Sequence, residues 1–500
     1  MTDLFYEKTI LKPLFNTGYL DAGTTYPRLI KLNEENKKGV FLATCDQGQL
    51  IKGRQVWPIF RTEDYGKTWD KIIDFQNDYE DCPLQMNPVL FEIPKGTNGF
   101  ESGMILLSGI IKPQDISKTI LPIYYSKDGG YHWNRLAQVD GGGPAIYNNS
   151  PEAKTTAIWE PLFFVNKYGD LTIGYSDERM KSEGILQALV LKYFNPNKNT
   201  WSPIYPMVAY PHPYHRPGMI SIVRTKNSGY VGVYEVVNSP SIEKNFAEIF
   251  VCHSEDGLVW NFQDMGTKIK TRDGVVPGSA PFVSTINTEK GEAIIVSSKW
   301  MIVENEVRNC QDLFINYTDG YGYWDRIPMP ISYNCVNTEV ENSAYSQSIL
   351  GGDNELFQLV TVNNEKTQLN DLMFGSLKLP DFTIDAKQMG EENNILTFLT
   401  KDATSSRVAE LTVISRLRIK VPSTNFINSI AIRYRSVSYP STLLLWINNQ
   451  PRLIYLEKTH KKFKWIFVKV NEIIYSEIFI EDLQGARTIE IDSCNFYFKN

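Results

Sequence analysis

The chain has 500 residues, of which 12% are aromatic, and a formal net charge of -6. Its length exceeds what one hydrophobic core usually holds, so we expect one large repeat fold with an appendage, or two to three domains. The acidic balance and the lack of a lysine or arginine stripe argue against a nucleic-acid-binding protein. The lack of an apolar run of about 18 residues argues against a membrane-spanning one.

Short runs rich in Val, Ile, Tyr and Phe, separated by Gly, Asn, Asp and Pro, predict many short strands and almost no helix. Residues 1–21 come first and are expected to supply one strand that closes a ring against the last repeat. The chain from there to about residue 385 falls into six similar stretches, which open near Tyr26, Asn87, Trp159, Arg216, Ala280 and Tyr345. This repetition predicts six four-stranded blades around a central channel.

Four of these stretches contain a turn that combines an acidic residue, one or two glycines and a tryptophan, at residues 62–69, 126–133, 254–260 and 318–324. The first two fit S/T-x-D-x-G-x-x-W in full, and the fourth is degenerate. Aspartate can bond its own backbone, glycine tolerates positive φ, and tryptophan can fix the turn to the sheet. The turns resemble the Asp-box of sialidases and related glycoside hydrolases, which lies between the third and fourth strands of a blade, away from the active site. We therefore expect them to be structural.

The predicted fold is all-β, with a six-bladed β-propeller over residues 1–388 and a C-terminal β-sandwich-like accessory domain over residues 389–500. Residues 391–394 form a polar stretch, after which the tryptophan turn does not recur and the apolar runs at residues 443–447 and 463–468 suggest the sandwich. The accessory domain either binds carbohydrate or supports the propeller. Exposed Trp446 or Trp465 would favour carbohydrate binding, and a core position for them is the expected one.

The opening strand of each blade lines the channel of a propeller, so functional residues are expected there. Glu160 lies between a tryptophan and a proline in an otherwise apolar run, where burial would raise its pKa toward that of a general acid. Glu235 ends a strand in the fourth stretch. Two carboxyl groups that flank a glycosidic bond are the minimum for its hydrolysis. Either glutamate could instead form a structural ion pair with Arg28 or Arg216.

Six segments, at residues 26–29, 158–162, 174–179, 216–219, 234–236 and 345–346, resemble those of the glycoside hydrolase family 93 exo-α-1,5-L-arabinanases. Those enzymes are six-bladed propellers that release arabinobiose from the non-reducing end of linear arabinan with retention of configuration. The resemblance, which covers residues 20 to 385, implies a monomer that binds arabinan or an arabino-oligosaccharide. It implies no metal or other cofactor, no nucleic acid and no membrane.

The resemblance also implies roles for individual residues. Glu160 would be the general acid/base and Glu235 the nucleophile, with Tyr345 close to Glu235. A retaining mechanism predicts carboxyl groups about 5 to 5.5 Å apart. The expected substrate-binding set is Arg28, Asp46, Asn87, Trp159, Asp177 and Arg216. Asp177 and Glu178 face opposite sides of a strand, so at most one can face the channel, and Asp177 with Arg179 is expected to anchor a loop or a substrate hydroxyl.

Two alternatives stay open at the level of sequence. A sialidase would need three arginines, for which Arg28, Arg216 and Arg308 are available, together with Tyr345, Glu235 and Asp46. Its first motif, however, reads Arg-Ile-Pro where this chain has Tyr-Pro-Arg-Leu. A propeller that only binds carbohydrate is the second alternative. For location, we expect a secreted or cell-surface protein whose signal peptide is absent from this sequence, with the cytoplasm as the alternative.

Overall fold

The computed structural model describes the propeller and the C-terminal part with several gaps. In the propeller the described residues are 5–13, 23–33, 39–148, 155–227, 229–237, 247–310, 312–335 and 343–380. In the C-terminal part they are 382–385, 397–399, 407–411, 416–421, 426–436, 441–448, 450–457, 459, 462–474, 477–482 and 489–498.

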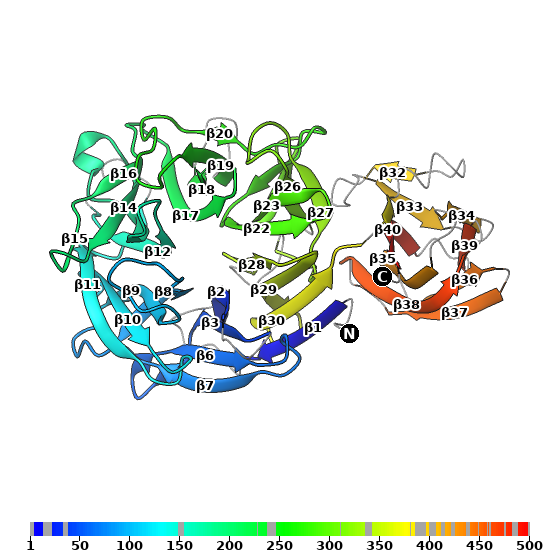
Figure 1. Cartoon of the computed structure of the whole chain (residues 1–500), viewed down its shortest axis with the longest axis horizontal. Helices are drawn as coiled ribbons and strands as arrows, with labels where there is room; N and C mark the ends of the chain where they lie inside the picture. Colours follow the sequence, from blue (N-terminus) through cyan, green and yellow to red (C-terminus); the bar gives the residue numbers. More distant parts are fainter. Residues whose placement is uncertain are drawn as a thin grey trace.

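Six antiparallel sheets stand around a central channel, each with its first strand innermost (Figure 1). The first blade consists of β2 (Thr24–Lys31), β3 (Phe41–Gln47), β6 (Trp57–Thr62) and β7 (Asp70–Phe75). The second consists of β8 (Leu84–Glu92), β9 (Ile105–Lys112), β10 (Thr119–Ser126) and β11 (Asn134–Gly142). The third consists of β12 (Ile158–Val165), β13 (Leu171–Asp177), β14 (Ala188–Asn195) and β16 (Tyr205–Val208), with β15 (Thr200–Trp201) beside β14.

The remaining blades follow the same order. The fourth contains β17 (Arg216–Thr225), β18 (Gly229–Val237), β19 (Ala247–Ser254) and β20 (Thr267–Lys268). The fifth contains β22 (Phe282–Thr288), β23 (Gly291–Ser297), β26 (Asp312–Asn316) and β27 (Asp325–Pro328). Between β23 and β26, a hairpin of β24 (Trp300–Val303) and β25 (Glu306–Asn309) pairs through β21 (Val276–Gly278) with the fourth blade. The fifth blade is therefore tied to its neighbour by an extra hairpin.

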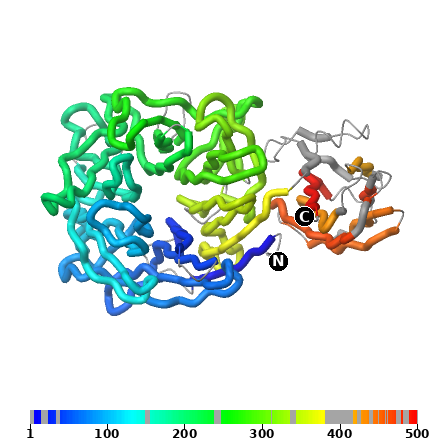
Figure 2. The backbone as a smooth tube through the Cα atoms, viewed as in Figure 1, coloured from blue at the N-terminus to red at the C-terminus, as the bar shows by residue number. Residues whose placement is uncertain are grey.

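The ring closes with a strand from the beginning of the chain. The sixth blade consists of β28 (Ser348–Gly351), β29 (Glu355–Asn364), β30 (Leu369–Lys378) and, outermost, β1 (Phe5–Leu11). In the β1 and β30 register, Lys8 lies opposite Phe374. The backbone trace shows the blue N-terminal strand along the last blade (Figure 2). The six-bladed all-β fold and the closing strand from the first 21 residues are thus confirmed.

The tryptophan turns connect the third and fourth strands of their blades, as expected. The indole N–H groups of Trp69, Trp133 and Trp260 donate to the carbonyl oxygens of Gly66, Gly130 and Gly257 at 2.9, 2.9 and 3.1 Å. In the degenerate turn of the fifth blade, the Asn316 side chain accepts from the backbone N–H groups of Thr318 and Gly320, both at 2.8 Å. The amide of Asn316 thereby replaces the serine or threonine hydroxyl of the other turns.

The C-terminal part is a sandwich of two sheets around an aliphatic core. One sheet contains β32 (Thr397–Leu399), β33 (Arg407–Leu411), β40 (Ile489–Phe498), β35 (Phe426–Ser436) and β38 (Lys464–Ile473). The other contains β34 (Arg416–Lys420), β39 (Glu477–Asp482), β36 (Ser441–Ile447) and β37 (Gln450–Leu456). Because β31 (Phe382–Asp385) pairs with β40, the sandwich begins before the expected boundary, which lies outside the described residues. Trp446 and Trp465 are half-buried.

A buried ionic network joins the sandwich to the fifth blade. The Arg433 guanidinium on β35 donates to Asp312 of β26 at 2.9 Å and to Asp492 of β40 at 3.0 Å. All three side chains are fully buried. Phe5 of the closing strand also stacks on Phe467 of the sandwich, with ring centroids 5.3 Å apart. The sandwich therefore contacts the propeller at both the fifth blade and the ring closure.

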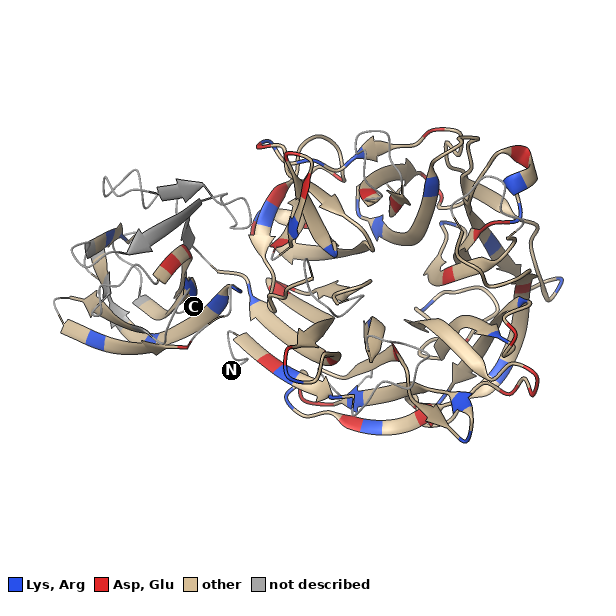
Figure 3. Cartoon of the chain, turned by 180° about the vertical axis from the view of Figure 1, so that it is seen from behind, with Lys and Arg blue, Asp and Glu red and all other residues tan. Residues whose placement is uncertain are grey.

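Two general features of the described residues complete the fold. Basic and acidic ribbon segments are interspersed around the propeller (Figure 3). No helix in the described part of the chain is long and apolar enough to cross a membrane.

Candidate active site

Four inner strands of the propeller share one β-bulge. Where β2 pairs with β3, Thr25 lies opposite Asp46 and Arg28 lies opposite Thr44. Three residue steps along β2 therefore correspond to only two along β3, which means that β2 carries one extra residue. The same shift occurs in β8, β12 and β17. At the first bulged position stand Tyr26, Asn87, Glu160 and Met219, all with left-handed φ between 51° and 58°.

The bulge explains how the channel acquires its functional side chains. A bulge re-aims the side chain at its centre, and bulges occur frequently beside active sites. A left-handed backbone costs most non-glycine residues about 1–2 kcal/mol, so its occurrence at Tyr26 and Glu160 on the channel requires a reason, whereas asparagine tolerates it better. Strain of this kind gathers at functional sites. Tyr26, Asn87 and Glu160 each precede a proline and all three line one cavity.

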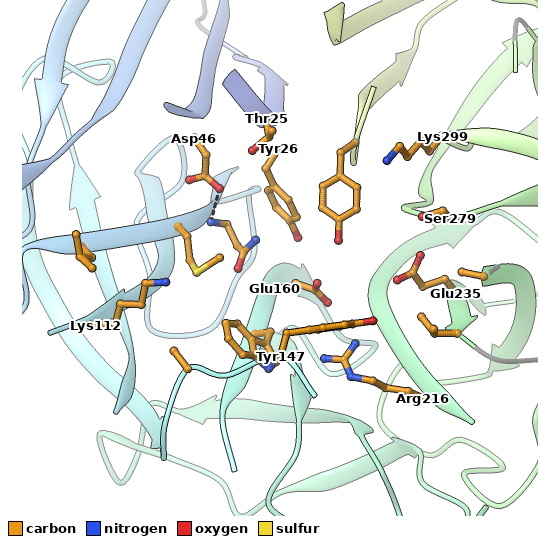
Figure 4. Close-up of a pocket in the computed structure, with 18 of the residues that line it drawn as sticks. Thr25, Tyr26, Asp46, Lys112, Tyr147, Glu160, Arg216, Glu235, Ser279 and Lys299 are labelled. Atoms are coloured by element: carbon orange, nitrogen blue, oxygen red, sulfur yellow. Dashed lines mark hydrogen bonds between the residues drawn. The ribbon is translucent and has the colours of Figure 1, made fainter. Parts of the chain in front are cut away.

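The cavity lies in the channel and has a volume of about 690 Å³. Its charged lining residues are three acids and three bases, which are Asp46, Glu160, Glu235, Lys112, Arg216 and Lys299. Aromatic side chains contribute much of the remaining wall, namely Tyr26, Tyr147, Trp159, Trp300 and Tyr345. The carboxyl groups of Glu160 and Glu235 face one another across it (Figure 4).

Glu160 is a half-buried residue that lines the cavity and receives its hydrogen bonds on one carboxyl oxygen. Its Oε2 atom accepts hydrogen bonds from the Ser176 hydroxyl at 3.1 Å and from the backbone N–H of Met219 at 2.9 Å. Burial is the largest influence and raises the pKa of Glu160 to about 6, while Arg216 lowers it and Glu235 raises it further. Because both hydrogen bonds end on Oε2, Oε1 is left to hold the proton. This is the state that a general acid needs near neutral pH.

Glu235 has more groups that favour its ionised form. Its Oε2 atom accepts from the backbone N–H of Ala280 at 2.8 Å. Burial raises its pKa above the ordinary value, whereas the Ala280 N–H, Arg216, the Ser279 hydroxyl and Lys299 all lower it. Two cations and two hydrogen-bond donors thus oppose the effect of burial. These groups limit the rise in the pKa of Glu235 that burial causes.

Three carboxyl groups that line the cavity share one backbone arrangement. Asp46, like Glu160 and Glu235, accepts the N–H of a left-handed residue on the next blade, in its case Asn87 at 2.9 Å. Burial is the main influence that raises the pKa of Asp46 to about 7. Asp46 and Glu235 also hold equivalent positions, opposite Thr25 on β2 and Gly218 on β17. An acid that accepts the N–H of a left-handed residue on the next blade therefore occurs three times in this channel.

The arginine nearest the two glutamates is bound by a different acid. Arg216 donates to the fully buried Glu178 at 2.8 Å, and Glu178 also accepts from Trp159 Nε1 at 3.3 Å and from Lys181 at 2.9 Å. The guanidinium of Arg216 lies 4.7 Å from the centroid of the Tyr147 ring. Glu178 therefore orients two cavity-lining residues, and Arg216 is not the ion-pair partner of Glu160 or Glu235.

Tyr345 stays neutral at this site. Burial, and then the charges of Glu160 and Glu235, raise the pKa of its hydroxyl far above the ordinary value. Its ring lies 6.3 Å from that of Tyr26, centroid to centroid. A protonated phenol near two carboxyl groups is a hydrogen-bond donor in either ionisation state of the pair.

The structure brings most of the predicted site residues into this cavity and leaves two outside it. Those that line it are Asp46, Asn87, Trp159, Glu160, Arg216, Glu235 and Tyr345. Arg28 instead lies behind the site, where it stacks at 3.9 Å on Tyr26 and donates to the backbone oxygen of Ser346 at 2.8 Å. Asp177 is fully buried and accepts from Arg179, which also pairs with Asp140. Asp177 therefore anchors the loop that follows β13.

Several residues that line the cavity are not among those that the sequence predicted. Tyr26 takes the position expected for Arg28, because the bulge between Thr25 and Arg28 changes which side chain faces the channel. Superposing the blade openings on their prolines would have found it, since Tyr26, Asn87 and Glu160 each precede one. Lys112, Tyr147, Lys299 and Trp300 lie outside the opening strands, and no sequence signal marks them. In the described part of the chain, no cluster of three or more His, Cys, Asp or Glu side chains could hold a metal ion.

Comparison with known proteins gives matches at the level of structure. No protein-family model and no curated protein matches the chain. A Penicillium chrysogenum α-L-arabinanase in complex with arabinobiose has a TM-score of 0.62 and 27% identity, over 74% of this chain and 97% of that one. A family 93 α-L-arabinofuranosidase of Fusarium graminearum in complex with arabinobiose has a TM-score of 0.62 and 24% identity, over 75% and 98%. The chain thus has the propeller fold of the glycoside hydrolase family 93 enzymes.

Proposed function

We propose that this arabinan-degrading glycoside hydrolase acts from the non-reducing end of α-1,5-linked L-arabinan, releases arabinobiose and retains the anomeric configuration. The observation that carries the proposal is the pair of carboxyl groups of Glu160 and Glu235, which face one another in a single channel cavity. Support for the substrate comes from the two structural neighbours described above, each of which holds arabinobiose.

The environments of the two glutamates support distinct roles in a two-step displacement. Glu160, with a pKa raised to about 6, protonates the leaving glycosidic oxygen while ionised Glu235 attacks the anomeric carbon. The bond to the leaving oxygen breaks as the covalent glycosyl-enzyme forms. Glu160, now a carboxylate, then takes a proton from water, whose oxygen attacks the anomeric carbon and releases Glu235. Tyr345 contributes a neutral hydroxyl to the same cavity as the carboxyl pair.

The charge of the cavity favours a neutral sugar over an anionic one. Three acids and three bases line it. A sialidase would need three arginines around one substrate carboxylate, but among the candidates only Arg216 lines the cavity. Arg28 is bound to Ser346, and Arg308 is a half-exposed residue of β25 that pairs with Glu306. We therefore favour the arabinan substrate over the sialoside.

The test is product analysis with two substrates. The protein is incubated with linear arabinan and, separately, with sialyl-lactose, and the products are separated by chromatography. Arabinobiose as the first product from arabinan, with the α-anomer observed first by proton NMR, supports the proposal. Free sialic acid, or a ladder of longer oligosaccharides, contradicts it. The Glu160→Gln and Glu235→Gln variants serve as controls for contaminating activity, and size-exclusion chromatography tests the proposed monomer.

A further inference from the structure

We propose that the buried ion pair of Glu178 and Lys181 positions one wall of the candidate active site and thereby sets how tightly the cavity holds its sugar. The wall consists of Trp159, Arg216 and Tyr147, and we call it the cation–aromatic wall. Its three residues come from β12, from the start of β17 and from the loop after β11. The inference rests on the proposed function, because it concerns the support of that same site.

Glu178 is fully buried and follows β13 directly. Its backbone N–H donates to the carbonyl oxygen of Ala157 at 3.0 Å, which ties it to the segment before β12. Its Oε1 atom accepts from Arg216 Nη2 at 2.8 Å and from Trp159 Nε1 at 3.3 Å. One carboxyl oxygen therefore receives a donor from each of two neighbouring blades. Hydrogen bonds to a charged group are among the stronger ones, so they fix both donors.

The second carboxyl oxygen extends this support to the loop that carries Tyr147. Lys181, in the short 3-10 helix η1 (Lys181–Glu183), donates to Glu178 Oε2 at 2.9 Å. The same ammonium group donates to the backbone oxygen of Asn148 at 3.3 Å. The Lys181 side chain is only 6% exposed. Because Asn148 directly follows Tyr147, the ion pair reaches all three residues of the cation–aromatic wall.

The wall combines an aromatic surface with hydrogen-bond donors. The Tyr147 ring is 61% exposed, and its centroid lies 4.7 Å from the Arg216 guanidinium carbon (Figure 4). The Arg216 side chain is 5% exposed, and among the described residues its Nε atom has no hydrogen-bond partner. A buried donor without an acceptor is costly, and a sugar hydroxyl can supply that acceptor. The wall therefore suits a neutral sugar.

Replacement of Glu178 by glutamine should loosen this wall and leave the catalytic pair in place. The amide oxygen can still accept a hydrogen bond, but the amide NH2 group cannot accept from Lys181. Two buried cations also lose their shared counter-charge. The hydrogen bonds to Glu160 and Glu235 come from other residues and are retained. Substrate binding should therefore weaken more than turnover.

Glu248 provides a matched control. It is buried on β19 and pairs with Lys268 at 3.0 Å, and neither residue lines the cavity. Glu248→Gln removes the charge of a buried glutamate from an ion pair with lysine, as Glu178→Gln does. Both variants should lose stability, but only Glu178→Gln should change the cation–aromatic wall.

The experiment labels the full-length protein with 5-fluorotryptophan and assigns the Trp159 fluorine resonance by its loss in Trp159→Phe. This readout needs no substrate. We expect the resonance to shift in Glu178→Gln and to stay in place in Glu248→Gln. With linear arabinan, KM should rise about tenfold in Glu178→Gln while kcat stays within about threefold. Lys181→Met keeps both hydrogen bonds on Oε1, so it should raise KM without moving the Trp159 resonance.

A double variant tests whether Glu178 acts through Arg216. If it does, the losses in kcat/KM of Glu178→Gln and Arg216→Met do not add when the two are combined. Additive losses, an unchanged Trp159 resonance in folded Glu178→Gln, or an equal rise of KM in Glu248→Gln would overturn the inference. Thermal unfolding establishes that each variant is folded. If Glu178→Gln does not fold, a raised KM in Lys181→Met supports the inference and an unchanged KM overturns it.

Two outcomes separate this inference from the proposed function. If the wild type does not cleave arabinan but the Trp159 resonance shifts in Glu178→Gln alone, the proposed function fails while the positioning of the wall stands. If arabinan is cleaved and KM is unchanged in Glu178→Gln, the proposed function stands and the inference fails.

Discussion

Replacement of Glu160 by glutamine tests the central assignment, because it removes the acidic proton while keeping the hydrogen bonds of the site. The glutamine oxygen can accept from Ser176 and Met219 as Oε2 of the carboxyl does. The variant should therefore fold and bind substrate. With a pKa of about 6, roughly one tenth of Glu160 is protonated at pH 7 and roughly one hundredth at pH 8. Since the general acid acts in its protonated form, wild-type kcat/KM should fall about tenfold per pH unit above pH 6.

The assay measures kcat/KM between pH 4 and 9 with arabinan and with an aryl arabinobioside that carries a nitrophenolate leaving group. Loss of general acid catalysis should lower kcat/KM for arabinan by about 10²–10⁴-fold. The loss should be much smaller for the aryl substrate, whose leaving group needs no proton, and the basic limb of the profile should disappear. Equal losses with both substrates, or a basic limb that persists in Glu160→Gln, would refute the assignment of Glu160 as the acid.

Further predictions concern the nucleophile, pH and stability. Glu235→Gln should lower kcat for both substrates by several orders of magnitude, and single-turnover kinetics that still show a covalent intermediate would contradict this. Because the folded-state pKa of Asp46 is raised to about 7, the stability that it contributes is present below about pH 4 and is lost as the pH rises through 7. The thermal midpoint of the wild type should therefore fall between about pH 4 and pH 7, and it should fall less in Asp46→Asn. An equal fall in both proteins would contradict this prediction. Arg433→Met leaves two buried aspartates without their shared partner and should reduce the free energy of unfolding by about 3–5 kcal/mol in urea titrations. In the control Arg308→Met, whose pair is exposed, the change should stay within about 0.5 kcal/mol. Trp133→Phe removes the indole hydrogen bond to Gly130 and should cost about 1 kcal/mol of stability with kcat unchanged; a loss of activity in the folded variant would place that turn in the site.

The architecture was predictable because each blade carries its own local signals. The tryptophan turns mark the third connection of a blade, and the opening runs mark its first strand. These two signals fixed the blade count and placed Glu160, Asn87 and Arg216 on the channel. These signals depend on residues that lie close together in sequence, so they can be recognised from the sequence alone.

The choice between neighbouring side chains was not predictable from strand periodicity. Alternate residues of a regular strand share a face, but an extra residue in the ladder changes the parity of everything after it. For this reason Tyr26, rather than Arg28, faces the cavity. Lys299 reaches the cavity because a hairpin crosses to the neighbouring blade, and Tyr147 reaches it from a loop. Both are tertiary placements that no local pattern encodes.

The pairing of β1 with β30 has a consequence for how the protein is made. During translation the closing strand leaves the ribosome before its partner, which follows only after five other blades have emerged. At about 5–20 residues per second, β1 then waits for roughly tens of seconds with an unpaired edge. During that interval the incomplete ring of blades also exposes the face of its most recently formed blade that will pack against the next one. Unpaired strand edges promote association between chains, so nascent copies of this propeller need to be kept apart until the ring is shut.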